Sequence, residues 1–134
     1  MKKAKILVVE DNPMNMELAS DLLLISGYQV LMATHAREGI EMAKIEMPDL
    51  VLMDIGLPDI NGLEATAMLK KDQATHSIPI VALTAHAMNG DEEQARAAGC
   101  IGYITKPIDM QTFAPAVERF LNAAAVEQNT GSYS

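Results

Sequence analysis

The sequence predicts an α/β protein with a doubly wound, five-stranded parallel sheet. Apolar runs of strand length alternate along the chain with segments whose apolar residues recur at helical spacing. Strands and helices that alternate in this way build a parallel sheet covered on both faces, and right-handed crossovers favour the doubly wound form. We expect the strand order 2-1-3-4-5. The 134 residues suit one domain with a sizeable core.

The first two strand–helix units occupy the beginning of the chain. "KILVVE" (5–10) is an apolar run with β-branched residues and predicts a strand, and the segment 15–26 has apolar residues at helical spacing. Gly27 follows that segment, at a position where glycine commonly ends a helix. The segments 28–33 and 36–46 repeat the pattern and predict a second strand and a second helix.

The third unit contains an apolar run that stops at an acid. "DLVLMD" (49–54) predicts a strand buried on both faces, as parallel sheets require. The segment 62–72 predicts the helix that follows. Glu64 near its start and Lys70 and Lys71 near its end have the charges that the helix dipole favours there.

The last two units complete the sheet. Residues 78–84 and 101–105 predict the fourth and fifth strands, and 91–99 between them predicts a helix with few large apolar side chains. The final helix has an apolar stripe formed by Met110, Phe113, Val117, Phe120 and Leu121. We therefore expect one folded domain over residues 1–122 and a disordered polar tail over 123–134.

Composition excludes several classes of function. The net charge of −8 comes with no basic patch, which argues against direct binding of nucleic acid. The longest apolar runs have four residues, or six where proline is counted, too few for a membrane span or a signal sequence. The single Cys100 leaves no internal disulfide and fits the cytoplasm; we expect it to be buried. We also expect most of the ten Met residues to fill the core.

Polar residues follow four of the five predicted strands. Glu10 and Asp11 come after the first, Asp54 after the third, Thr84 after the fourth and Lys106 after the fifth. Taken singly, such residues are commonly turn formers, helix caps or surface groups. In the expected strand order, however, the carboxyl ends of the first and third strands flank the point where strand order reverses. The sequence therefore predicts that the three acids converge, with the threonine and the lysine beside them.

Three converging carboxylates need a positive partner. Two unit charges ~4 Å apart interact by about 4 kcal/mol at an effective dielectric constant of about 20. Lys106 can balance one carboxylate, and a divalent cation with oxygen ligands, Mg²⁺ above all, can balance the others. A cation, a lysine and a hydroxyl around one carboxylate suit phosphoryl transfer, with Asp54 as the nucleophile.

Four motifs carry a resemblance to a known family. "ILVVEDNPMN", "DLVLMDIGLPDINGLE", "IPIVALTAHA" and "GYITKPID" resemble the receiver domain of bacterial two-component response regulators, over residues 5 to about 122. This resemblance implies a CheY-like, flavodoxin-like (βα)5 fold. Within the family the chain is most similar to single-domain regulators of the DivK type and to the receivers of hybrid kinases.

The resemblance implies a role for each acid of the site. Asp54 matches the phosphoacceptor of the family. Glu10 and Asp11 match the acidic pair that holds Mg²⁺ or Mn²⁺, together with Asp54 and the backbone carbonyl of Gly56.

The resemblance also implies a switch. Thr84 matches the switch hydroxyl and Lys106 the phosphate-binding lysine, whose bond to Pro107 the family holds in the cis form. Tyr103 matches an aromatic residue that swings inward when the threonine moves; the alternative is a half-buried strand tyrosine. Two variable positions that tune phosphate lifetime hold Gly56 and His86 here, and that lifetime stays open. Leu57 replaces a frequent Met, which is a mild change.

The implied function is signalling. A histidine kinase or a histidine phosphotransfer protein would phosphorylate Asp54, and the face made by the fourth and fifth helices and the fifth strand would bind a downstream protein or serve a phosphorelay. We expect a cytoplasmic monomer or weak homodimer that promotes its own phosphoryl transfer and dephosphorylation and turns over no external substrate. The opening Met and the polar tail favour a regulator with no attached output domain over a receiver cut from a longer chain.

Three other functions fit the sequence less well. An aspartate-nucleophile phosphatase would need a second Asp where Gly56 stands. A flavodoxin-like cofactor binder would need a phosphate-binding loop after the first strand, where "EDNPMN" places two acids. A third alternative is a receiver that no longer takes phosphate and only binds partners; the presence of every motif residue argues against it.

Overall fold

A computed structural model describes the backbone of residues 3–85 and 91–131 and the side chains of residues 3–85 and 92–125. Its strands are β1 (Lys5–Val9), β2 (Gln29–Ala33), β3 (Leu50–Asp54), β4 (Ile80–Thr84) and β5 (Gly102–Thr105). Its helices are α1 (Pro13–Ile25), α2 (Ala36–Glu46), α3 (Gly62–Lys71), α4 (Asp91–Ala98) and α5 (Phe113–Gly131).

The five strands form one parallel sheet in the order β2-β1-β3-β4-β5. This confirms the predicted fold class and strand order. The helix predicted over 36–46 has these bounds in the structure, and the other strands and helices begin within three residues of their predicted starts, apart from the last helix.

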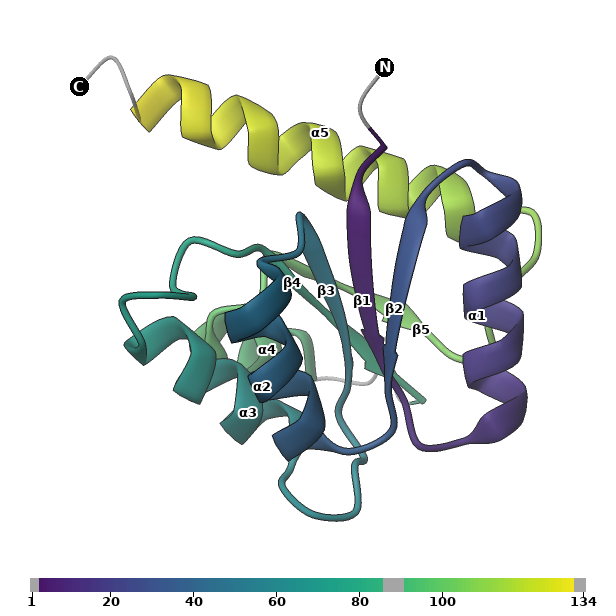
Figure 1. Ribbon diagram of the computed structural model, residues 1–134, viewed down its shortest axis with the longest axis horizontal. Coiled ribbons are helices and arrows are strands. Elements are labelled where there is room, and N and C mark those ends of the chain that lie inside the picture. The colour runs from purple at the N-terminus through teal and green to yellow at the C-terminus, as the bar shows by residue number, and fades with distance from the viewer. Residues whose placement is uncertain (1–2, 86–90, 132–134) are drawn as a thin grey trace.

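Helices cover both faces of the sheet, α1 and α5 on one side and α2, α3 and α4 on the other (Figure 1). Successive residues of a buried strand point to opposite faces, so each strand contributes to two cores. Leu52 and Leu83, for example, pack with Leu23 of α1 and Phe113 of α5. Met53 packs in the other core, with helices α2 to α4.

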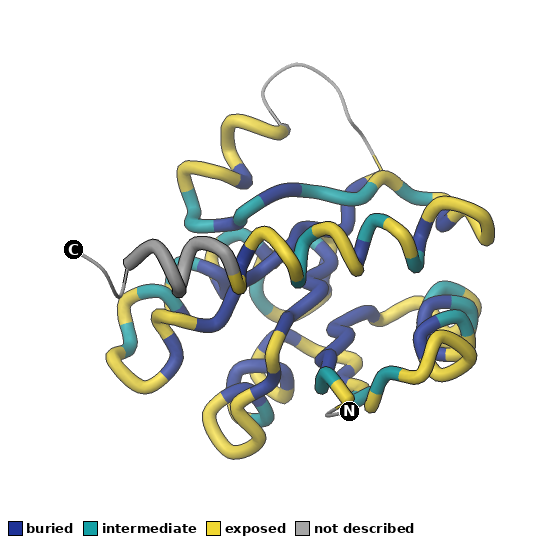
Figure 2. The backbone as a smooth tube through the Cα atoms, turned by 90° about the horizontal axis from the view of Figure 1, so that it is seen from above, coloured by how far each residue is buried: buried dark blue, intermediate teal, exposed yellow. Residues whose placement is uncertain are grey.

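The three central strands of the sheet, β1, β3 and β4, are the most buried part of the molecule (Figure 2). Every residue of β3 and β4 is buried. A strand buried along its whole length holds its last residue in a fixed place, because neighbours on both faces and both edges restrain it. This matters for Asp54 and Thr84, which are the last residues of these strands.

Methionines contribute less to the core than predicted. Of the eight whose side chains are described, Met16 and Met53 are buried and Met42 is partly buried. The exposed ones are Met14, Met32, Met47, Met68 and Met110. The prediction was wrong because Leu, Ile, Val and Ala of the strands and inner helix faces already fill both cores.

The last helix is longer than predicted. It begins at Phe113 and continues to Gly131, so residues 123–131 are helical where the sequence analysis expected a disordered tail. Alanine is the best helix former, and three alanines at 123–125 prolong the helix, with Ala124 buried. The domain boundary at residue 122 stays a prediction.

Three further features bear on the sequence analysis. Cys100 is buried as expected, with its thiol 3.9 Å from the Thr66 hydroxyl, and burial raises the pKa of this thiol. His86, which the sequence analysis singled out, lies outside the described residues. In the part of the chain that the structure describes, no helix is long and apolar enough to cross a membrane.

Candidate phosphoacceptor and metal site

The candidate site lies at the carboxyl edge of the sheet. Glu10 follows β1, Asp54 and Thr84 end β3 and β4, and Lys106 follows β5. β1 and β3 are hydrogen-bonded neighbours although β2 separates them in sequence, so strand order reverses here. The site is thus built where open parallel sheets commonly bind ligands.

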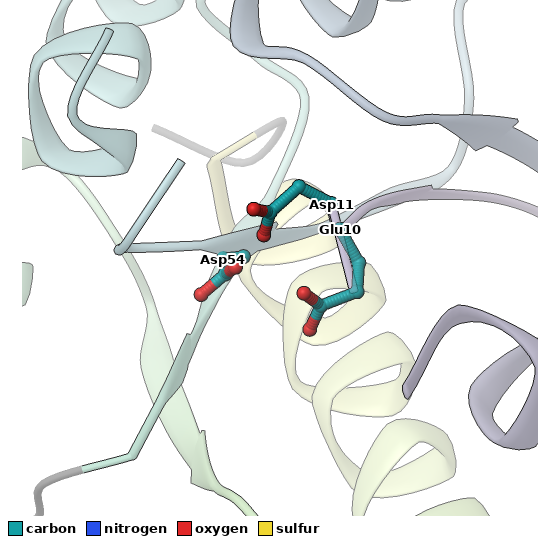
Figure 3. A group of neighbouring side chains, drawn as sticks. All are labelled: Glu10, Asp11 and Asp54. Atoms are coloured by element: carbon teal, nitrogen blue, oxygen red, sulfur yellow. The ribbon is translucent and has the colours of Figure 1, made fainter. Parts of the chain in front are cut away.

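Three carboxylates converge at this edge. Glu10, Asp11 and Asp54 each offer an oxygen, and these atoms lie within 4.8 Å of one another (Figure 3). Glu10 and Asp54 are 1% and 3% exposed, whereas Asp11 is exposed. Two acids are therefore held away from water and a third closes the group on the solvent side.

Lys106 bridges the two buried acids. Its Nζ lies 3.0 Å from Asp54 Oδ1 and 3.2 Å from Glu10 Oε1. Burial by itself would lower the pKa of Lys106, but the hydrogen bond to Asp54 and the charges of both carboxylates outweigh it and raise this pKa. The lysine is thus held in its charged form beside the candidate nucleophile.

Glu10 is the acid whose protonation the site changes most clearly. Burial is the main reason that its pKa rises to about 7, and the neighbouring Asp54 raises it further. The N–H of Asn12, which donates to Glu10 Oε2 at 3.1 Å, and the charge of Lys106 act in the opposite direction. One lysine therefore does not neutralise the group fully, and a cation would favour the ionised form.

Local backbone structure orients the acids. The N–H of Gly56 donates to Asp54 Oδ1 at 3.1 Å, which fixes one carboxylate oxygen. In the loop after β1, Asn12 caps α1 by accepting a hydrogen bond from the N–H of Asn15, and Pro13 occupies the first helical position. The first helix therefore begins directly beside the acidic pair.

The predicted site residues line one cavity of about 300 Å³. Glu10, Asp11, Asp54, Gly56, Thr84 and Lys106 all contribute to its wall. Asn12 and Asn15, which the sequence analysis missed, line it too. Their spacing of three residues at the start of a helix, directly after two acids, was the signal that could have identified them.

Two predicted residues lie elsewhere. Tyr103 is half-buried on β5, packs against the core under α2 to α4, and lines a separate hollow of about 360 Å³ between β5 and α5. This position agrees with the switch role and with the plain strand tyrosine alike. Pro107 follows the site lysine, and the Lys106–Pro107 bond is cis.

The donor set suits a hard divalent cation. The group offers carboxylate oxygens and the nearby backbone of Gly56, with no thiol or imidazole among the described residues that line the cavity. Oxygen donors of this kind, few enough to leave several waters bound, are typical of Mg²⁺ and Mn²⁺ sites. The residues therefore fit the metal that the sequence analysis expected.

Comparisons with known proteins agree with this geometry. The family model described as the response regulator receiver domain matches residues 6–118. The polar-differentiation response regulator DivK of Brucella anthropi is 44% identical over 119 residues, which cover 89% of this chain and 97% of that protein. The same protein of Brucella ovis matches equally well.

Solved structures give the same result. The chemotaxis response regulator CheY4 of Vibrio cholerae superposes with a TM-score of 0.84 at 25% identity, covering 89% of this chain and 99% of that one. The receiver domain of a sensor histidine kinase from Pseudomonas aeruginosa, described with a magnesium ion coordinated in its active-site cleft, has a TM-score of 0.82 at 31% identity. That match covers 90% of this chain and 99% of the other.

Proposed function

The chain belongs to the response regulator receiver family, and from that premise we propose that it accepts a phosphoryl group on Asp54 and changes its binding surface in response. It is a protein of two-component signalling rather than a metabolic enzyme. The observation that carries the proposal is the position of Asp54: buried, within 3.0 Å of Lys106 Nζ, and grouped with two further acids.

The proposed step transfers one phosphoryl group between proteins. An oxygen of Asp54 attacks the phosphorus of a phosphohistidine, the phosphorus–nitrogen bond breaks, and the imidazole nitrogen leaves with the electron pair. Glu10, Asp11, Asp54 and the carbonyl of Gly56 would hold Mg²⁺ or Mn²⁺. The cation would neutralise charge on the phosphoryl oxygens. Lys106 would also neutralise charge on these oxygens, and the Thr84 hydroxyl would donate to one of them.

A change of surface would follow from the new charge. An aspartyl-phosphate carries about −1.5 to −2 charges where the carboxylate carried one, a net gain of about −0.5 to −1, by analogy with other phosphorylated side chains. This attracts Thr84 and Lys106, and Tyr103 would move inward as the threonine shifts. α4 offers little resistance, because Ala95 is the one buried side chain among its residues 92–98. The population of a second state of the α4-β5-α5 face would then rise.

The partners follow from the chemistry. The donor would be a histidine kinase or a histidine phosphotransfer protein in the cytoplasm. The α4-β5-α5 face would bind a downstream protein, or the phosphoryl group would pass onward in a relay. We propose a monomer or weak homodimer with no direct role in binding nucleic acid, which the net charge of −8 supports.

Intact mass spectrometry tests the proposal. The protein is incubated with a small acyl-phosphate or phosphoramidate donor, with Mg²⁺ or with a chelator, alongside Asp54→Ala. Asp49→Ala is the matched control, because it removes an aspartate at the opposite edge of the sheet. We expect one phosphoryl adduct that requires Mg²⁺ and Asp54 and is unaffected by the control. No adduct with either donor, or an adduct on Asp54→Ala, would contradict the assignment. The decay time of the adduct separates a relay from a binding output.

A further inference from the structure

Asp59 links two segments that are far apart in the sequence. It lies in the loop of residues 55–61 between β3 and α3, and its carboxylate accepts hydrogen bonds from the N–H groups of Ala36 at 2.9 Å and Arg37 at 3.0 Å. These are the first two residues of α2, 23 and 22 positions earlier in the chain. The loop that follows the candidate phosphoacceptor is therefore attached to a neighbouring helix.

α2 depends on this distant carboxylate at its first turn. His35 occupies the N-cap position but makes no capping hydrogen bond with its side chain. Asp59 supplies the acceptor instead and places a negative charge at the positive end of the helix. The hydrogen bonds from Arg37 and Ala36 lower the pKa of Asp59 to about 2, so the carboxylate is ionised throughout the physiological range.

The same loop includes Gly56. This residue is exposed and has no side chain, so its neighbours determine its place. On one side, its N–H donates to Asp54 Oδ1. On the other side, the loop is held where Leu57 is buried and where the N–H of Gly62 donates to the carbonyl of Ile55 at 2.9 Å.

The hydrogen bonds of Asp59 join the β3–α3 loop to α2 from outside the site cavity. Asp59 is exposed and does not line this cavity, so it has no direct contact with a bound cation there. Without its two hydrogen bonds, residues 58–61 would be held by the burial of Leu57, by the packing of the half-buried Ile60 against the core and by the start of α3. The Gly56 carbonyl, three residues from Asp59, would then sample more orientations.

We propose that Asp59 is a positioning residue of the phosphoacceptor site, which binds the β3–α3 loop to the start of α2 and so holds the Gly56 carbonyl and the Asp54 carboxylate ready for a divalent cation. This rests on the function proposed above. Groups that orient metal ligands without touching the metal commonly change its affinity by about 10–100-fold when they are removed.

The chain offers a matched control for a merely structural role. Asp49 also joins two distant segments through a backbone hydrogen bond, since its Oδ2 accepts from the N–H of Lys5 at 2.7 Å. Like Asp59 it is exposed. It lies before β3, at the edge of the sheet opposite the site. Asp49→Ala therefore removes a side-chain link of the same kind, with one hydrogen bond rather than two, without disturbing the loop that includes Gly56.

The experiment compares Asp59→Ala, Asp59→Asn and Asp49→Ala with the parent protein. Mg²⁺ affinity is measured by amide NMR titration, the amide shifts of Ala36, Arg37 and Gly56 are recorded without metal, and urea unfolding reports stability. We expect Asp59→Ala to bind Mg²⁺ about tenfold more weakly and to shift the Gly56 amide before any metal is added. Asp59→Asn should recover most of the affinity, because its amide oxygen still accepts from the helix.

Two outcomes would overturn the inference. One is an Mg²⁺ affinity of Asp59→Ala within about twofold of the parent, well short of the usual effect of such groups. The other is an equal loss in Asp49→Ala. If Asp59→Ala does not fold, Asp59→Ser, whose hydroxyl can accept at most one of the two bonds, is judged by the same criterion. A parent protein that binds Mg²⁺ but forms no phosphoryl adduct would contradict the proposed function and leave this inference standing.

Discussion

At the scale of single residues, the site combines two buried acids with one lysine. Lys106 contacts Glu10 and Asp54 at once, yet burial still raises the pKa of Glu10 to about 7. The metal-free protein therefore keeps an acid that is only partly ionised near neutral pH. A cation that binds there competes with this proton.

The raised pKa of Glu10 predicts how the stability of the metal-free protein depends on pH. A glutamate in an unfolded chain releases its proton near pH 4.5, whereas folded Glu10 holds it up to about 7. Between these values the folded state binds more protons than the unfolded state, so the free energy of unfolding should fall as pH rises. Urea unfolding in a chelating buffer across this window measures the slope.

Glu10→Gln is the control for this prediction. Because glutamine does not titrate, the free energy of unfolding of the Glu10→Gln protein should depend less steeply on pH over the same window. Added Mg²⁺ should stabilise the parent protein more at the upper end, where Glu10 is ionised. Equal slopes for the two proteins would contradict the assigned pKa shift.

At the scale of elements, the start of α3 lies against the end of β3. A Cβ atom built on Gly62 would overlap the backbone oxygen of Asp54 and would lie 2.8 Å from its carbonyl carbon. Backbone cannot give way as a flexible side chain can. The close approach of these two elements therefore requires glycine at this position, and it places the helix beside the candidate phosphoacceptor.

Gly62→Ala should disturb both stability and the site. Forcing the helix away from β3 should lower the free energy of unfolding by about 1–3 kcal/mol. It should also weaken Mg²⁺ binding, because Asp54 must move. Chemical denaturation and an Mg²⁺ titration give the two values. Gly56→Ala serves as the control for stability, since its nearest contact would be Asp54 Oδ1 at 4.0 Å. Gly62→Ala with the stability of the parent would contradict the steric argument.

At the scale of the whole molecule, one sheet supports two cores. The core under α1 and α5 and the core under α2, α3 and α4 share the buried strands between them. A displacement at the carboxyl edge of β3 or β4 can therefore reach helices on either face. Residues 122–125, the last of α5 whose side chains are described, add little to either core, because Ala124 is the buried side chain among them.

Shortening the chain tests the predicted boundary at residue 122. A protein ending there should unfold cooperatively and lose about 1 kcal/mol, the value of the one alanine methyl group that is buried among the described side chains of the removed segment. Thermal and urea unfolding, followed by circular dichroism, provide the measurement, and Mg²⁺ affinity should match that of the full chain. Loss of cooperative unfolding would show that residues 123–131 are integral to the domain.

Local patterns were informative about the elements and about the candidate ligands. The apolar run ending at Asp54 and the helical spacing over residues 36–46 depend on neighbouring residues alone, and both appear in the structure as predicted. The exposed methionines and the length of α5 were missed. Hydrophobicity does not reveal which apolar residues the core has room for, and an alanine run is ambiguous until its neighbours are known.

The sequence by itself determined the kinds of elements, their order and the polar residues that end the strands, because periodicity and turn chemistry act over a few residues. Only the tertiary structure decided what these residues do to one another. The contacts of Lys106 with Asp54 and Glu10 join positions 52 and 96 residues apart, and Asp59 bonds to a helix 22 and 23 residues earlier. The contact distances, the burial of these residues and the resulting pKa shifts depend on segments that are distant in the sequence and meet only in the folded sheet.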